Sequence, residues 1–509
     1  MHYFEFAEKD ATLYEASQSL NSGLDEILEV RKDISDTATT IDVSRALIKF
    51  DLTEISESIV AGIIPDSGSK AARYYLNLFD AKPTSLASSQ SLFAYPVSQS
   101  WVMGDGRSYD NPITTDGCSW TFSKGQDDGT LWTPELSASG ATWYQNFASG
   151  SFTLISGSTG NFGTSSNDEV QLTVAGTEFN FIATASIDAT GTGSVPDDTS
   201  PNFFFNTGSI TSEFASNLAD EINAADIGIT ASFSSTSGSL GAVGTVNLHL
   251  TASSITTAGL TDISIDTGSS GNYSDILTLG GGGVPYEASQ SFTQKSEDVR
   301  MDVTYIVQAW LSQSIDNEGF LIKRRGNVGN SDKFSDENNK QDLGNFSFFS
   351  SDTHTKYPPT LEVVWDDSKW RPGTLEQLSS TELEDTVVYM KGLRPDYKEK
   401  SKARFRVVGR ARFPETTYST TPANLTVKVL PPSSSFYSIL DAETDDVIVP
   451  YGSGSKLSCD SNGNYFNLDL NGFQPERYYK IEYRIQSGSK TEDELNLYYD
   501  EGFTFKVSL

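Results

Sequence analysis

Short runs of alternating apolar and polar residues, separated by turn-forming Gly, Ser, Asn and Asp, recur throughout this chain of 509 residues. In the run RALIKFDL, Ala46, Ile48 and Phe50 share one face of an extended strand. The same period recurs in 72–81 and near residue 360. Period-2 runs at short spacing with turn residues between them are typical of β-sandwiches and jelly rolls. The sequence therefore predicts a mainly β protein.

Two stretches break this pattern and predict helices. In 209–228, Phe214, Leu218 and Ile222 recur at i, i+4 and i+8, which forms one apolar stripe of a helix. Ser and Thr precede this stripe and a Gly follows it, as expected for helix caps. The stretch 301–314 shows helical spacing over a shorter length.

The segment 150–285 has a different texture, because it is dense in Gly, Ser and Thr and almost free of basic residues. Such a composition also suits a flexible linker. However, DEVQLTVAGTEFNFIATA and VNLHLTAS alternate cleanly on either side of the predicted helix. We therefore interpret 150–285 as a small folded α+β module, with a linker as the alternative.

The composition is strongly acidic, with 36 Lys and Arg against 68 Asp and Glu and a net charge of −32. Such a chain repels nucleic-acid phosphates and anionic membranes, so neither is an expected partner. The start, MHYFEFAEKD, lacks the positive region and apolar run of a signal peptide, and no window suits a membrane span. We expect synthesis in the cytoplasm without a signal peptide.

Residues with distinctive chemistry are few. Cys118 and Cys459 lie far apart in the sequence, so no disulfide framework is expected. The three His residues show neither metal-ligand spacing nor a nucleophile-elbow pattern. Among 68 acidic residues, no pair stands out as the two carboxylates of a glycosidase. The sequence predicts no catalytic, cofactor-binding or metal-binding residue.

The stretch YPVSQSWVMGDGRSYDNP (95–112) places Trp101 beside a Gly- and Asp-rich loop, and Trp120 and Trp132 follow it. A Trp in this setting is typical of a carbohydrate site and also of a strand end. Because the stretch runs from a strand into a long loop, we expect Trp101 to be a core or corner residue. The alternative is that these Trp rings are exposed and that Trp101 and Trp120 contact a glycan.

The same loop carries Asp105, Asp110 and Asp116, whose carboxylate oxygens are ligands of the kind that Ca²⁺ takes. Their spacing does not match an EF-hand loop. Asp beside Gly is also simply a turn former. We expect turns here, with Ca²⁺ binding as the alternative.

Basic residues concentrate between residues 391 and 412. In SKARFRVV, Lys402, Arg404 and Arg406 share one strand face, with apolar side chains on the other. The basic face is either solvated or a contact for an acidic surface of another subunit or of this chain, with nucleic acid as a third reading. The candidate interface residues of this segment are Lys400, Lys402, Arg404, Arg406, Arg410 and Arg412.

The stretch PERYYKIEYRI adds a second candidate interface. Tyr478 and Tyr479 fall on opposite faces of a strand, with Arg477 on the side of Tyr479. Because Tyr and Arg are enriched at interface hot spots, a subunit contact is plausible. Packing of a Tyr corner inside the domain is the alternative. The candidate residues are Glu476, Arg477, Tyr478 and Tyr479.

The first and third parts of the chain resemble the DNRLRE family. The similarity rests on DATLYEASQSLNSGLDEILEV, SRALIKFDLTEI, DVTYIVQAWLSQSIDNEGFLIKRR and FSFFSSDTHTKYPPTLEVVW, within 10–135 and 285–367. The hexapeptide that names the family is absent. The resemblance implies a jelly-roll β-sandwich of the kind found in bacterial surface and carbohydrate-associated proteins.

The other two parts resemble modules of phage particles. The order TVAGTEFNF, ADEINAA, ITASFSS and VNLHLTASS is similar to a small unit of tailed-phage structural proteins. Residues 372–509, with the specific run FQPERYY, look like a β-domain of virion structural proteins in large contractile-tailed phages, notably those of cyanobacteria. These resemblances imply a component of a phage particle.

We therefore expect a jelly-roll β-sandwich (1–149 plus 286–370), an inserted α+β module (150–285), and a C-terminal β-sandwich or barrel (371–509) for virion attachment. The expected function is that of a non-enzymatic structural protein of a tailed-phage virion, in its tail, baseplate or neck. It would contact other virion proteins and copies of itself. The alternatives are a carbohydrate- or receptor-binding module that contacts a host-surface glycan, resembling a fibre or adhesin, and a capsid decoration protein.

Overall fold

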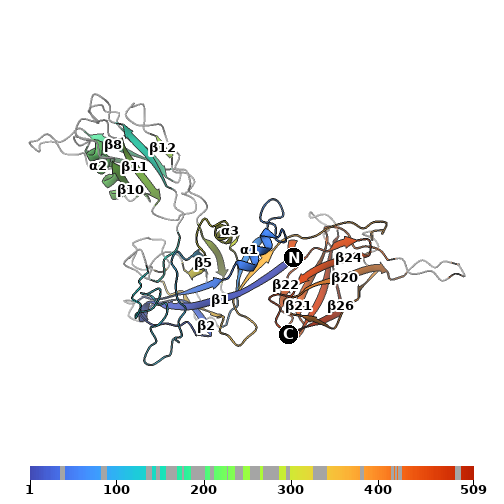
Figure 1. The fold of residues 1–509 in the computed structure, drawn as a ribbon. Coiled ribbons are helices and arrows are strands. Elements are labelled where there is room, and N and C mark those ends of the chain that lie inside the picture. The colour runs from blue at the N-terminus through green and yellow to red at the C-terminus, as the bar shows by residue number, and fades with distance from the viewer. Residues whose placement is uncertain are drawn as a thin grey trace, which may run out of the picture. The chain divides into compact units, whose positions relative to one another are not determined.

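The computed structural model divides the chain into two compact units, unit 1 (Met1–Tyr144 and Glu287–Leu509) and unit 2 (Gln145–Tyr286). Unit 1 in turn contains two separate hydrophobic cores. The residues that the structure describes are 1–34, 41–81, 89–132, 140–144, 149–155, 169–174, 177–184, 201–206, 211–225, 227, 229–235, 245–252, 264–266, 286–293, 298–324, 337, 341–378, 383, 385–413, 418, 421, 427–487 and 495–509. The prediction of a mainly β protein built from β-sandwiches is confirmed (Figure 1).

The first sandwich surrounds one core of unit 1, and its central path runs β13-β5-β15-β3-β1-β17-β4-β14, with β2 paired to β3 and β16. Its strands are β1 (His2–Tyr14), β2 (Ile27–Ile34), β3 (Ile41–Phe50), β4 (Arg73–Leu78), β5 (Ser89–Pro96), β13 (Ala288–Thr293), β14 (Val299–Asp302), β15 (Phe320–Lys323), β16 (Gly344–Phe349) and β17 (Thr360–Val364). The period-2 prediction holds here, because Tyr74, Leu76 and Leu78 of β4 all point into the core.

The short helices of the first sandwich are η1 (Glu15–Ser17), α1 (Thr53–Val60) and α3 (Thr304–Leu311). The predicted helix at 301–314 is confirmed as α3, which buries Ile306, Val307 and Trp310. The sequence did not predict α1, which buries only Ile55. Leu52, Ile55 and the partly buried Ile59 pack on the first core, but this stripe spans only about two turns, which is too short for periodicity to identify a helix.

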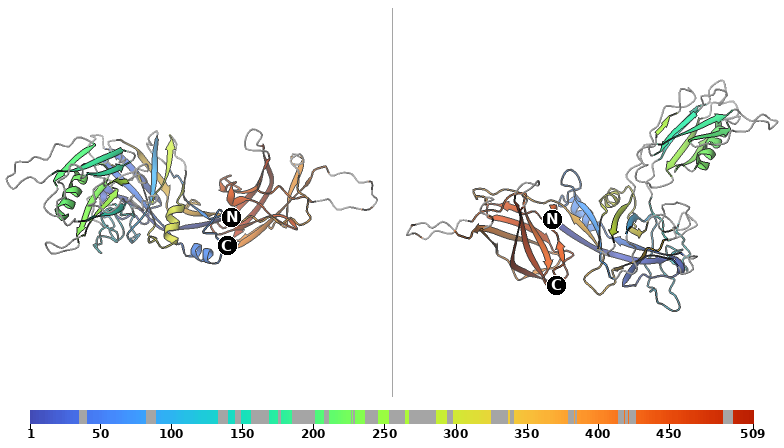
Figure 2. Two further views of the ribbon diagram at one scale, coloured as in Figure 1. Left: turned by 90° about the horizontal axis from the view of Figure 1, so that it is seen from above. Right: turned by 180° about the vertical axis from the view of Figure 1, so that it is seen from behind.

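The C-terminal sandwich packs a sheet of order β18-β20-β24-β23 against a sheet of order β19-β26-β25-β21-β22 (Figure 2). Its elements are β18 (Thr386–Lys391), β19 (Asp396–Lys398), β20 (Lys402–Ala411), β21 (Ser435–Asp441), β22 (Val447–Val449), η2 (Ser453–Ser455), β23 (Ser458–Asp460), β24 (Gly463–Asp469), β25 (Arg477–Ser487) and β26 (Leu495–Ser508).

Strand β1 joins the two sandwiches of unit 1. Its first residues alternate between cores, since Tyr3 lies in the first core and Phe4 in the C-terminal one. The Asn471 side-chain amide donates to the Phe4 carbonyl at 3.2 Å. A Cβ at Gly472 would lie 2.4 Å from the Phe4 Cβ, so only glycine lets the backbone approach this closely.

Unit 2 is an α+β module, as the sequence predicts for this segment. Helix α2 (Thr211–Ala224) lies against the sheets of the module (Figure 1). It buries Leu218 and Ile222, whereas the Phe214 side chain lies outside the described residues. The sheets have the orders β10-β11-β6 and β12-β7-β8-β9. Their strands are β6 (Ser149–Ile155), β7 (Glu169–Val174), β8 (Thr177–Thr184), β9 (Asn202–Asn206), β10 (Ile229–Ser235), β11 (Thr245–Ala252) and β12 (Ser264–Asp266).

The Gly- and Asp-rich loop after Trp101 wraps around one side chain, Asn21. Its Nδ2 donates to the carbonyls of Met103 and Cys118 at 2.6 and 3.0 Å, and its Oδ1 accepts from the Gly106 N–H at 2.7 Å. A Cβ at Gly104 or Gly117 would lie 2.4 or 2.3 Å from Asn21 atoms. The glycines of the loop are therefore required by close packing.

The Asp side chains of this loop accept hydrogen bonds that stabilise its turns. The Asp110 carboxylate accepts from the Arg107 N–H at 2.9 Å and from the Thr114 hydroxyl at 2.8 Å. The Asp116 carboxylate accepts from the Asp105 N–H at 3.3 Å. These bonds match the turn-forming reading of the loop.

We predict that Asn21→Ala lowers the free energy of unfolding of the first sandwich by about 3 kcal/mol, because it leaves several buried backbone groups without partners. Six of the seven Trp residues lie in the first sandwich, and Trp370 pairs with Cys459 of β23, so the main change in Trp fluorescence during urea unfolding reports on the first sandwich. The matched control is the exposed Gln126→Ala. Equal unfolding midpoints for the two variants would contradict the prediction.

Asp10 of β1 generates a pH-dependent prediction. Its side chain is 1% exposed, its Oδ2 accepts from the Ser351 N–H at 2.6 Å, and its Oδ1 has no hydrogen-bond partner within the described residues. Burial raises the pKa of this carboxyl from 3.8 to about 7. The folded state therefore favours the protonated carboxyl, whereas the unfolded chain ionises it above about pH 4. The free energy of unfolding consequently falls as the pH rises from about 4 to 7.

Asp10→Asn is therefore expected to stabilise the first sandwich above pH 7, by up to about 4 kcal/mol. The gain should shrink towards zero as the pH falls to 4. Urea unfolding at pH 5 and pH 8, with the exposed Asp127→Asn as the control, measures it. A pH-independent difference between Asp10→Asn and the parent would refute the titration of this carboxyl.

Candidate functional site

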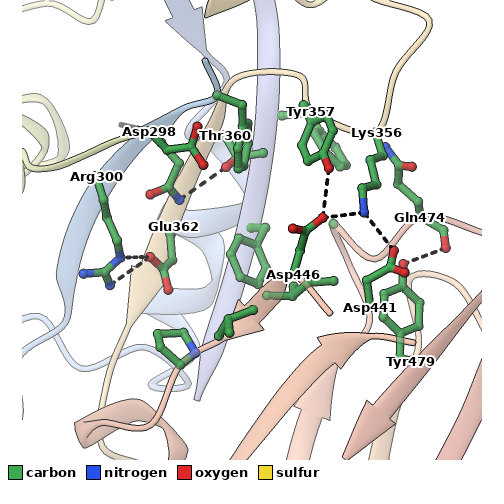
Figure 3. Close-up of a pocket in the computed structure, with 18 of the residues that line it drawn as sticks. Asp298, Arg300, Lys356, Tyr357, Thr360, Glu362, Asp441, Asp446, Gln474 and Tyr479 are labelled. Carbon is green, nitrogen blue, oxygen red and sulfur yellow. Dashed lines mark hydrogen bonds and ion pairs between the residues drawn. The ribbon is translucent and has the colours of Figure 1, made fainter. Parts of the chain in front are cut away.

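A cavity of about 310 Å³ lies between the outward face of the first sandwich and the C-terminal sandwich (Figure 3). One wall consists of side chains from β1, β17, β4 and β14, and of the segment before β17. The other wall consists of side chains from the β21–β22 region and from the start of β25. The site is thus assembled from several segments that lie far apart in the sequence.

The sheet wall presents a row of side chains across four neighbouring strands. Strand register pairs Phe6 with Thr360, Thr360 with Asn77, and Asn77 with Arg300. The Asn77 amide donates to the Thr360 hydroxyl at 3.4 Å, and Phe6 is 37% exposed. An aromatic ring, a hydroxyl, an amide and a guanidinium therefore follow one another along the cavity wall.

Beside this row lies a buried carboxylate, Glu362. Its Oε1 is 2.7 Å from His2 Nδ1, and its Oε2 accepts from Arg300 at 2.9 Å. Burial alone would raise the pKa of Glu362, but the hydrogen bond from His2 and the Arg300 guanidinium outweigh it and lower that pKa. Glu362 is therefore ionised and paired at neutral pH.

The opposite side of the cavity is held by a network around Lys356. Lys356 Nζ donates to Asp441, Thr444 and Asp446 at 3.1, 2.6 and 2.7 Å. The Tyr357 hydroxyl also donates to Asp446, at 2.8 Å (Figure 3). Lys356 and Tyr357 belong to the first sandwich and their partners to the C-terminal one, so this network ties the two sandwiches together.

Asp441 is the centre of this network and is 1% exposed. Arg477 Nε donates to it at 2.8 Å. Burial raises the pKa of Asp441, but the N–H groups of Glu443 and Thr444, together with Lys356 and Arg477, outweigh burial and lower that pKa to about 2. Ionised Asp441 therefore stabilises the fold above pH 4, and this stabilisation is lost as the pH falls through 2.

Asp441→Asn is expected to lower the free energy of unfolding by about 2 kcal/mol at pH 7, and the deficit should disappear near pH 2. Scanning calorimetry at several pH values measures both effects. The control is Asp445→Asn in the same turn, where the residue is exposed and its φ of 58° is one that Asn tolerates. If both variants melt with the parent at pH 7, the network does not stabilise the fold.

The Trp residues considered as glycan contacts are buried, as expected of Trp101 as a core or corner residue and contrary to the alternative of exposed rings. Trp101, Trp120 and Trp132 are each 3% exposed. Trp101 Nε1 donates to the Glu318 carbonyl at 2.8 Å, and the Lys9 ammonium lies 4.2 Å from the centre of its ring. Trp101 is thus a core or corner residue, and the rings of Trp101 and Trp120 offer no open face to a sugar.

The basic segment forms a strand, β20, whose faces follow the predicted alternation. Its cations have partners inside the C-terminal sandwich. Lys402 lies 3.4 Å from Asp469, Arg404 donates to Asn467 at 3.0 Å, and Arg406 forms a bidentate pair with Asp460 at 2.9 and 2.8 Å. Lys400 and Arg412 are exposed, and Arg410 is half-buried.

The second predicted interface, residues 476–479, has some side chains at the surface and others in the interior. Glu476 pairs with Lys506, and Tyr478 is 51% exposed. Tyr479 is buried, and its hydroxyl donates to the Gln474 carbonyl at 2.9 Å, which is the packing expected of a Tyr corner. Of the ten predicted interface residues, Arg477 and Tyr479 line the cavity.

The remaining cavity residues were not predicted. In its local sequence, each of them looks like an ordinary strand or turn residue. Only the strand register and the contact between the two sandwiches bring them together. No local pattern in the sequence could have indicated this site.

Within the part of the chain that the structure describes, no group of three His, Cys, Asp or Glu side chains could hold a metal ion. In the same part, no helix is both long and apolar enough to cross a membrane. Comparison of the chain with protein-family models, curated proteins and solved structures finds no match.

Proposed function

We propose that the protein is a non-enzymatic structural component of a tailed-phage virion, placed in the tail, baseplate or neck, that acts through protein–protein contacts. The similarity of 372–509 to virion β-domains motivates the proposal. A partly exposed aromatic surface on the C-terminal sandwich, centred on the exposed Tyr498, is the observation that supports contact with another protein.

This surface, here called the aromatic face, comprises Phe436, Tyr451, Arg484 and Tyr498. It lies on the outward side of β25 and its neighbours, because Tyr483 and Ile485 of β25 point into the core. The Arg484 guanidinium lies 4.9 Å from the ring centres of both Phe436 and Tyr451. The rings of Tyr451 and Tyr498 lie 5.9 Å apart, and Tyr498 is 60% exposed.

The aromatic face has the composition of an interface hot spot. Tyr and Arg dominate such sites, since they combine a large apolar area with directional polar groups. The Arg484 Nε is buried without a hydrogen-bond partner among the described residues. The rings of Phe436 and Tyr451, which lie against the Arg484 guanidinium, also hold that side chain in place. A partner would therefore meet a preorganised surface.

Mass spectrometry of purified tailed-phage particles is expected to detect the chain, and cryo-EM of those particles should place it in several symmetry-related copies. The aromatic face should be buried against another copy or another virion protein. Complete particles that lack the chain, or a map in which the aromatic face is open to solvent, would contradict the proposal.

Two variants test whether the aromatic face makes this contact. Particles assembled with Tyr498→Ala should incorporate the chain about tenfold less than the parent, because exposed aromatic anchors contribute more than 1 kcal/mol at interfaces. Tyr109→Ala, which removes an aromatic side chain that is 71% exposed in the first sandwich, is the matched control. Equal incorporation of both variants would exclude the aromatic face as the contact.

A further inference from the structure

The cavity between the sandwiches has the features of a binding site for a small molecule. Its volume of about 310 Å³ falls at the lower end of the range of ligand sites. Two of its apolar side chains remain accessible, since Phe6 is 37% and Val447 58% exposed. A molecule that enters the cavity would bury further apolar area of both side chains.

The charges of the cavity favour a neutral ligand. Its cations are Arg300, Lys356 and Arg477, and each of them already pairs with a carboxylate. Lys356 is surrounded by three oxygen acceptors from the C-terminal sandwich. An anion would have to compete with these internal carboxylates for the same donors. A neutral molecule leaves all the ion pairs intact.

The remaining polar groups both donate and accept hydrogen bonds. Asn77 and Thr360 stand side by side in the cross-strand row, and Gln474 lines the cavity from the C-terminal sandwich. Neighbouring strands lie roughly 4.8 Å apart, which is close to the length of one pyranose ring. Amides and hydroxyls at this spacing, next to a partly open aromatic ring, match the alternating hydroxyls and apolar face of a sugar.

We propose that this cavity binds a neutral saccharide of one or two pyranose units. The apolar face of the sugar packs on Phe6, and its hydroxyl groups bond to Asn77 and Thr360. Neither Trp101 nor Trp120 lines this cavity. The inference also does not depend on the virion proposal, because sugar binding is measured on the isolated chain.

Saturation-transfer difference NMR on the full chain tests the proposal, with methyl glucoside, N-acetylglucosamine, cellobiose and maltose as neutral probes and glucuronate as the anionic one. At least one neutral probe should bind with a dissociation constant in the millimolar range or below. Phe6→Ala and Asn77→Ala should each weaken that binding about tenfold, the equivalent of one lost contact of 1.4 kcal/mol. Glucuronate should bind more weakly than the neutral probe.

Tyr305→Ala is the matched control, because Tyr305 is an aromatic residue with the same 37% exposure on α3, and its loss should leave binding unchanged. Val447→Trp, at the accessible Val447, should block entry without altering the core. Circular dichroism establishes that each variant folds. The proposal is overturned if no neutral probe binds, if binding survives Phe6→Ala, Asn77→Ala and Val447→Trp, or if glucuronate binds most tightly.

Discussion

The structure of unit 1 depends on one strand with two buried faces. The first residues of β1 insert Tyr3 into the core of the first sandwich and Phe4 into that of the C-terminal sandwich. Because successive side chains of a strand point to opposite faces, a single extended segment can supply both cores. Gly472 completes this joint by letting its backbone approach Phe4. The Lys356 network adds a second set of contacts between the same two sandwiches.

The same joint explains why charged residues lie in the interior. Where the two sandwiches meet, the middle of β17 and the end of β21 each place a carboxylate that water scarcely reaches. Glu362 and Asp441 are almost fully buried, and each is stabilised by hydrogen bonds and by an opposite charge. Burial of an unpaired carboxylate would cost several kcal/mol, so these networks are necessary for the joint to form. They also leave the cavity between them nearly neutral.

Two surfaces of unit 1 therefore differ in character. The aromatic face lies on the C-terminal sandwich alone and exposes Tyr498, whose ring meets that of Tyr451 edge to face, which suits another protein. The cavity is concave, needs both sandwiches, and mixes Phe6 with Asn77 and Thr360, which suits a small polar molecule. A structural role in a particle and recognition of a sugar can thus coexist in one chain, because they use separate residues.

The sequence by itself determined most of the local structure, with α1 as an exception. Alternation in 72–81 and in β20 predicted strands with the observed buried faces, and the stripe through Leu218 and Ile222 predicted α2. It could not determine whether Trp101 is exposed, since that depends on Lys9 and on Glu318, a residue more than two hundred positions away. Nor could it show the cavity. Periodicity reports which face of an element is apolar, whereas the partner of that face is chosen by packing between distant segments.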